Sequence, residues 1–150
     1  MGSALSGDSM KVTSFEILTI DAKRFAQSGE KAQNVRVDQN SSITEITKTG
    51  VDSANILFRL LINYANRGYI KIEGSVLVGE GIDPLIDEWS KTATMPVEEA
   101  NIVHNVIVSN CLPTALLVSR DVKLPPPFPL PRIDIQKKGG KPHIGGIEVA

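Results

Sequence analysis

The residues that could carry chemistry are few and widely scattered. The sequence has two histidines, His104 and His143, and a single cysteine, Cys111. His104 and Cys111 fall in an apolar run, whereas His143 falls in a glycine-rich terminal stretch. A metal site or a nucleophile–base pair needs such groups to converge. These positions therefore favour an ordinary helix-face histidine and a small buried cysteine, and they predict no metal site.

The carboxylates and glycines form no catalytic pattern either. Asp87-Glu88 and Glu98-Glu99 are adjacent pairs, and adjacent side chains of a helix point apart. The stretch "VGEGIDP" lacks both the GxGxxG spacing and a GK[ST] motif, so it suits a turn after a hairpin better than a phosphate loop. We therefore expect no enzyme activity, no catalytic residue and no cofactor.

Composition excludes further classes of function. The 150 residues suit one domain, and 41% of them are hydrophobic. The 16 basic and 17 acidic side chains nearly cancel, which argues against a nucleic-acid binder. No apolar run reaches the ~18 residues of a membrane span, so we expect no membrane insertion. One cysteine fits a reducing compartment, and we expect a cytoplasmic protein.

The chain divides into three parts. Residues 1–10 are small and polar, and they predict a disordered segment. Residues 11–135 predict a single folded domain. Residues 136–150 hold four glycines and three lysines, which is typical of a flexible tail.

Alternating apolar residues predict strands in the first half of the domain. We expect one strand in "VTSFEILTIDAKRF", apolar on both faces, and either one bulged strand or two short ones in "NVRVDQNSSITEIT". The stretch "NILFRLLINYANRGYIKIEGSVLVGEG" predicts a hairpin. Its first strand places Phe58, Leu60, Ile62 and Tyr64 on one face, and Gly68 supplies the positive φ of the turn.

The spacing of apolar residues then changes to that of an α-helix. "DPLIDEWSKTATM" predicts a short helix with Asp83 as cap and Pro84 at its first position. A longer helix should run from Pro96 to Arg120, with a kink or break at Pro113. Strands followed by helices indicate an α+β fold, with an antiparallel four-stranded sheet covered on one face by helices.

The stretch "DVKLPPPFPLPRIDI", residues 121–135, carries five prolines and also apolar residues between them. The prolines exclude a core strand, and Leu124, Phe128, Leu130 and Ile133 are unnecessary in a linker. Three interpretations remain open: a cover for the domain's own surface, the wall of a groove, or an SH3-type ligand whose basic residue is Lys123. We call residues 124–129 the proline strip.

The order of these elements resembles that of the SecB family of export chaperones. Residues 13–135 offer "SFEILTIDAKRF", "NVRVDQNSSITEI", the hairpin, "DPLIDEWSK" and "EEANIVHNVIVSNCLPTALLVSR" in the family's order. The closest local similarity is Val118-Ser119-Arg120 at the end of the long helix, followed by "PFPLPRIDI". One departure is the basic, glycine-rich tail, because the family's tails are polar and acidic.

The resemblance implies an ATP-independent holdase that binds unfolded or extended polypeptides in apolar grooves, in connection with protein export. It implies a homotetramer, built as a dimer of dimers, without metal or nucleotide. The candidate client groove comprises Leu124, Phe128, Leu130, Ile133, Phe58 and Leu60. The candidate oligomer interface comprises Ile102, Val103, Val106 and Ile107, since one sheet cannot cover every apolar face of the helix.

Two points stay open at this level. No acidic surface can be located for a SecA-type motor, so the residues do not predict that partner. The alternative to a holdase is a non-enzymatic regulatory or structural module that presents the proline strip to a protein partner.

Overall fold

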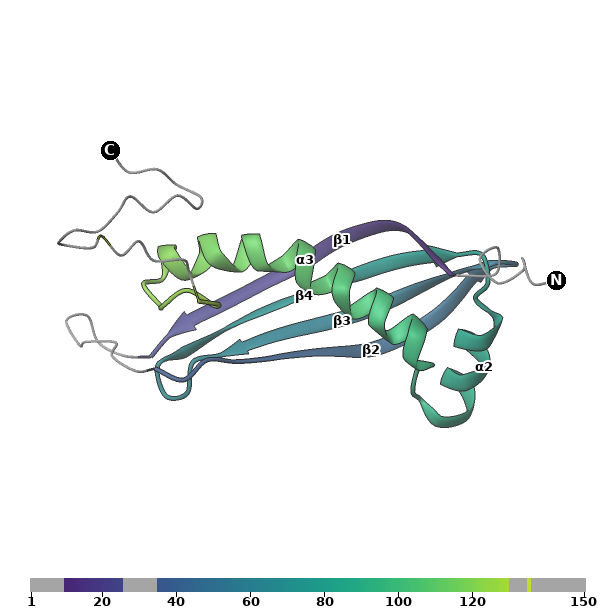
Figure 1. Ribbon diagram of the computed structural model, residues 1–150, viewed down its shortest axis with the longest axis horizontal. Helices are drawn as coiled ribbons and strands as arrows, with labels where there is room; N and C mark the ends of the chain where they lie inside the picture. Colours follow the sequence, from purple (N-terminus) through teal and green to yellow (C-terminus); the bar gives the residue numbers. More distant parts are fainter. Residues whose placement is uncertain (1–9, 26–34, 130–134, 136–150) are drawn as a thin grey trace.

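The computed structural model describes residues 10–25, 35–129 and 135. Four strands form an antiparallel sheet in the order β1-β4-β3-β2, and two helices follow (Figure 1). The elements are β1 (Lys11–Arg24), β2 (Asp38–Gly50), β3 (Ser53–Asn63), β4 (Gly68–Gly79), α2 (Asp83–Thr92) and α3 (Val97–Asp121). The predicted α+β fold with a four-stranded antiparallel sheet is confirmed.

The central hairpin of β3 and β4 forms the core. Every second side chain of β3 is fully buried, as are their neighbours on β4, and the set is Ala54, Ile56, Phe58, Leu60, Ile62, Ile70, Ile72, Val76 and Val78. Gly68 ends the turn with φ 154°, and a β-carbon there would overlap the Lys23 carbonyl oxygen. Glycine is therefore required by both the backbone angle and the close approach of β1.

Apolar residues of β1 occupy both odd and even positions because the strand contains bulges. Phe15 pairs with Val76 and Ile17 with Gly74, but the register shifts before Thr19, which pairs with Glu73. The extra residue moves the following side chains by one position, so that Ile20 pairs with Ile72 on the helix-covered face. The strand predicted to be apolar on both faces thus directs most of its apolar residues to one, while Leu18 and Ile20 remain 57% and 47% exposed.

β2 is one long strand with a bulge, which settles the two alternatives left by its sequence. One register shift lies between Ile43 and Glu45, after which Ile46 faces the core opposite Ile56, and a second lies between Lys48 and Gly50. Val35 and Val37 precede the strand. β2 and β1 are the two outer strands of the sheet.

The start of α2 differs from the prediction. Ile82 occupies the cap position, with no side-chain hydrogen bond, and Asp83 is already inside the helix. The Ile82 side chain is fully buried, so core packing fixes the entry to the helix in place of a polar cap. Asp83 contributes a negative charge in the first turn, where the helix dipole favours it.

α3 crosses the sheet obliquely and contacts all four strands (Figure 1). Its buried residues are Val103, Ile107, Cys111, Ala115 and Ser119. The helix continues through Pro113, so of the two alternatives predicted there, a kink or a break, the break is wrong. Pro113 and Ser109 are both exposed, and water can therefore satisfy the Ser109 carbonyl that has lost its partner.

By length and composition α3 is long and apolar enough to cross a membrane, contrary to the expectation from the sequence. Core helices of water-soluble domains have the same properties, and one such helix is weak evidence for a span. One stripe of α3 packs on the sheet, while apolar residues also occupy its outer surface.

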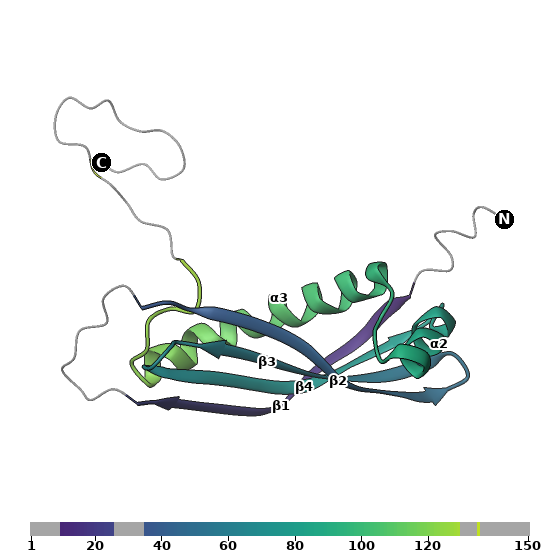
Figure 2. The ribbon, with the colours of Figure 1, turned by 90° about the horizontal axis from the view of Figure 1, so that it is seen from below.

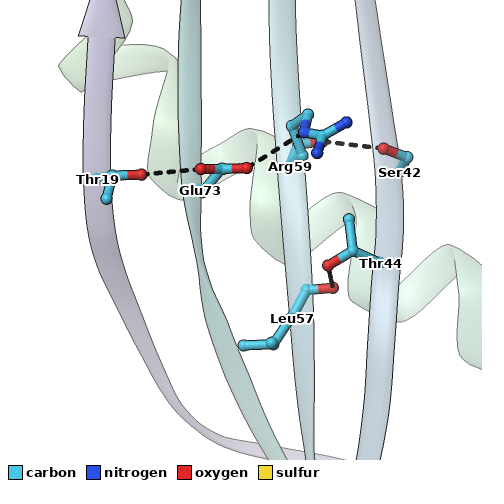
Figure 3. Close-up of polar contacts among 6 residues, drawn as sticks. All are labelled: Thr19, Ser42, Thr44, Leu57, Arg59 and Glu73. Carbon is cyan, nitrogen blue, oxygen red and sulfur yellow. Dashed lines mark hydrogen bonds and ion pairs between the residues drawn. The ribbon is translucent and has the colours of Figure 1, made fainter.

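The face of the sheet away from α3 carries a polar row across all four strands (Figure 3). The Thr19 hydroxyl donates to Glu73, and Arg59 Nε donates to the same carboxylate at 3.2 Å. The two bonds lower the pKa of Glu73, that from Arg59 contributing most. Ser42 donates to the Arg59 carbonyl oxygen. These groups are largely exposed, so each contact adds little stability.

Candidate functional site: a cavity beneath the proline strip

The end of α3 turns the chain back toward the sheet. Lys123 has a left-handed backbone (φ 59°), its N–H bonds the Arg120 carbonyl, and the Leu124 N–H bonds the Ser119 carbonyl at 2.9 Å. This pair of bonds is a Schellman motif, which usually places glycine where Lys123 stands. Arg24 Nε of β1 also donates to the Val122 carbonyl at 2.9 Å. The strip therefore leaves α3 in a fixed direction.

The proline strip then crosses to the beginning of β2 (Figure 2). Leu124 is buried, and its Cδ2 lies close to Gly68. Three residues later the Pro127 carbonyl accepts a hydrogen bond from Gln39 Nε2 at 2.9 Å. Because α3 runs obliquely, its last turns lie away from the start of β2, and the strip covers this corner of the sheet.

A cavity of about 650 Å³ lies between the strip and the chain around the start of β2. This volume is within the usual range for ligand pockets. Valine side chains, proline rings and one phenyl ring dominate its lining, and Gln39 is the polar member. The lining residues are Val35, Val37, Gln39, Pro125, Pro126, Pro127, Phe128 and Pro129.

Beside the cavity, β2 and α3 are joined by a polar contact. Ser41 Oγ lies 2.6 Å from His104 Nδ1. Ser41 pairs with Leu60 and Gln39 with Ile62, so both side chains share the helix-covered face. Burial lowers the pKa of His104, which keeps its ring neutral at physiological pH. His104 is thus more than the helix-face residue predicted from sequence, and it helps to fix α3 over β2.

The predicted groove residues occupy three different environments. Phe128 lines the cavity, whereas Leu124 is buried beneath the strip's first residues. Phe58 and Leu60 are fully buried in the core under α3 and do not line the cavity. Leu130 and Ile133 lie outside the described residues.

The predicted interface residues on α3 also separate into two pairs. Val103 and Ile107 are fully buried against the chain's own sheet. Ile102 and Val106 are half-buried and remain accessible from outside. Only the second pair is therefore free to contact another subunit.

Four residues of the site were missed from the sequence: Val35, Val37, Gln39 and Ser41. The available signal was the polar break at residues 39–42, which interrupts an otherwise alternating apolar pattern. Polar residues on the helix-covered face of a strand point to partners on a neighbouring element, and here the partners come from the strip and α3, although Gln39 is itself exposed and Ser41 half-buried.

The buried ionisable groups are chemically inert. Burial raises the pKa of the Cys111 thiol to about 11 and that of the Tyr64 phenol to about 12. Both are therefore neutral at physiological pH and unsuited to act as nucleophiles. Within residues 10–25, 35–129 and 135, no three His, Cys, Asp or Glu side chains gather as a metal site.

Comparison with solved structures identifies a distant relative of the fold. The SecB-like chaperone Rv1957 of Mycobacterium tuberculosis, solved in complex with a ChAD peptide from the Rv1956 HigA1 antitoxin, superposes with a TM-score of 0.56. The match covers 89% of this chain and 93% of that one, at 10% sequence identity. No family model and no curated protein sequence matches. The SecB-like fold expected from the sequence is therefore shown, as a distant structural relationship.

Proposed function

We propose that this protein is an ATP-independent holdase that binds extended or unfolded polypeptides in the cavity beneath the proline strip. The observation that carries the proposal is the cavity itself, which is open to a ligand and lined by apolar side chains with a single amide among them. Such a lining suits apolar side chains of varied shape, as a chaperone with many clients requires. Burial of client surface there would contribute about 25 cal/mol per Å².

The structural neighbour supports the same proposal. That chaperone binds a peptide, and its fold extends over most of this chain. A cytoplasmic location, a role in export and independence from cofactors are part of the proposal, and they derive from the resemblance to SecB. A SecA-type motor is not included, because the open face of the sheet carries paired charges of both signs around Arg59 and Glu73.

The alternative function, presentation of the strip to an SH3-type partner, has less support. Pro127 and Leu124 are buried, and the Pro127 carbonyl is bonded to Gln39. An SH3 domain binds the exposed face of a polyproline helix. Binding of the strip by such a partner would therefore require it to leave the sheet.

The test is substitution of Phe128, which lines the cavity and is only half-buried. Phe128→Ser should weaken binding of an unfolded, apolar-rich client by about tenfold or more, since loss of such a side chain removes roughly 1.5–3 kcal/mol of burial. It should also reduce suppression of client aggregation, while thermal stability changes little. Affinity is measured by fluorescence anisotropy with a reduced, carboxymethylated protein as client.

Val51→Ser is the control, because Val51 is 89% exposed in the turn between β2 and β3, at the other end of the sheet. It should leave affinity unchanged. Equal affinities for the wild type and the Phe128 variant, with equal stability, would remove the cavity from the proposal. A loss of stability without loss of affinity would indicate that the strip serves only to cover the core.

We further propose that the protein is a homo-oligomer. The outer surface of α3 leaves Val97 74% and Leu117 55% exposed, and Ile102 and Val106 are half-buried beside them. A second subunit would remove this apolar surface from water. Light scattering should give a mass that is a multiple of 16.2 kDa. A stable monomer at micromolar concentration contradicts the proposal.

A further inference from the structure

The two walls of the cavity offer a peptide backbone different hydrogen-bonding groups. Four of the five strip residues between positions 125 and 129 are prolines, which have carbonyl oxygens but no N–H. The strip can therefore accept hydrogen bonds but, apart from Phe128, cannot donate them. The other wall is the start of β2, where every residue has both groups. Only that wall can pair fully with an extended backbone.

β2 is an outer strand of the sheet. β3 pairs with its inner edge, and within the described part of the chain no strand pairs with its outer edge. Every second residue of an outer strand directs its N–H and C=O groups outward, which makes it a template for another strand. Residues 38–43 precede the bulge and keep a regular register with β3, so this segment is straight enough to extend the sheet.

The outer edge and the cavity meet at the same residues. The side chains of Val37 and Gln39 line the cavity, and Gln39 lies in the regular segment. Directly paired residues of neighbouring strands project to the same face of a sheet. A strand added beside residues 38–43 would therefore send every second side chain to the cavity side, beneath the proline strip.

We infer that an extended client binds as a fifth strand along the outer edge of β2 and inserts alternate apolar side chains into the cavity. The inference rests on the proposed function and specifies its binding mode. β2 supplies the backbone pairing, the strip supplies an apolar roof, and the bulge between Ile43 and Glu45 limits the length of the paired segment. The selected clients are segments in which apolar residues alternate with others.

The outer edge of β1 is less suited to this role. Register shifts interrupt both outer strands, at Val12/Ser14 and Ile17/Thr19 in β1 and at Ile43/Glu45 and Lys48/Gly50 in β2, so bulges do not distinguish the two edges. The distinction is the cavity beneath the proline strip, whose lining includes Gln39 of β2 and no residue of β1. The client edge is therefore assigned to β2.

The inference is tested with an acetylated, amidated peptide in which leucine and glutamine alternate between terminal lysines. A series of singly N-methylated versions is made, one for each central residue, and the affinity of each for the full chain is measured. N-methylation removes one backbone donor and leaves the side chain unchanged. Binding as an added strand predicts losses at every second position, of about fivefold or more at each, as expected for one backbone hydrogen bond. The intervening positions should bind like the parent peptide.

Amide hydrogen exchange of the protein provides a second test. When the parent peptide binds, outward-facing amides at every second position among residues 38–43 should exchange more slowly, and those of β3 should not change. Tight binding with no alternation in the N-methyl series, or with no protection in β2, would overturn the added strand while leaving the holdase intact. Failure of the parent peptide to bind would overturn both.

Discussion

The helix-covered face is held by different interactions in the central hairpin and at the corner near the start of β2. In β3 and β4 the helix-covered face is entirely apolar and at most 1% exposed, and α3 covers it. In the first half of β2 the same face carries Gln39 and Ser41, and their partners come from the strip and from His104. The centre is held by packing, whereas the corner is held by individual hydrogen bonds around a cavity.

This contrast indicates where the proposed client could bind without unfolding the domain. Removal of a covering element from the hairpin would expose many apolar side chains at once. Movement of the strip breaks the Gln39–Pro127 bond and exposes Leu124 and Pro127 together with the cavity lining. A typical hydrogen bond contributes about 0.5–1.5 kcal/mol net, which a client's own burial can offset. The proposed binding site thus lies where opening would expose fewer buried apolar side chains than in the hairpin.

The largest effect should follow substitution in the centre. Phe58 is 1% exposed and stacks on Phe15 with ring centroids 5.4 Å apart, and Gly74 leaves room for its ring. Phe58→Ala should lower the free energy of unfolding by about 3–5 kcal/mol, as measured by urea denaturation.

The control for Phe58→Ala is Val51→Ala at the exposed turn, which should change stability by less than about 0.5 kcal/mol. A loss below about 1 kcal/mol for Phe58→Ala would contradict the view that packing in the hairpin dominates stability. It would also weaken the contrast between the two regions.

Much of the centre could be predicted because its determinants are local. Alternation in the hairpin, together with Gly68, identified β3, β4 and the turn between them. In this hairpin periodicity and burial agree, so the pattern directly reflects the fold. In α3 the apolar spacing predicted the helix, but Val103 and Ile107, expected at an oligomer interface, lie on its buried stripe.

The corner could be predicted only in part, because its contacts join distant segments. The bond between Gln39 and Pro127 spans 88 residues, and that between Ser41 and His104 spans 63. No local sequence pattern predicts such pairs. The direction of the strip depends on the left-handed backbone of Lys123. Glycine usually occupies this position and would have signalled the turn, but it is absent here. Burial of Ile82 likewise replaced the cap expected from Asp83.

A smaller effect should follow loss of the bond that holds the strip. Gln39→Leu keeps the approximate size of the side chain but removes the donor to Pro127, so stability should fall by about 0.5–1.5 kcal/mol. The Phe128 amide should exchange faster, because the strip lifts more often. The control is Asn40→Leu, which alters the adjacent residue on the open face, opposite Leu61. Equal exchange at Phe128 in both variants would show that Gln39 does not hold the strip.

The smallest effect should be a pH dependence that arises from His104. Burial places its folded-state pKa below the ordinary value of 6.5, so the unfolded chain takes up the proton more readily than the folded one. The resulting stability is fully present above pH 6.5, and it is lost as the pH falls from 6.5 through the lower folded-state pKa. Urea denaturation of the wild type and of His104→Gln across this range isolates the contribution. Glutamine retains a polar group near Ser41 but does not titrate, so the difference in unfolding free energy between the two proteins should shrink on acidification. A difference that stays constant with pH would mean that protonation of His104 is not coupled to the contact between α3 and β2.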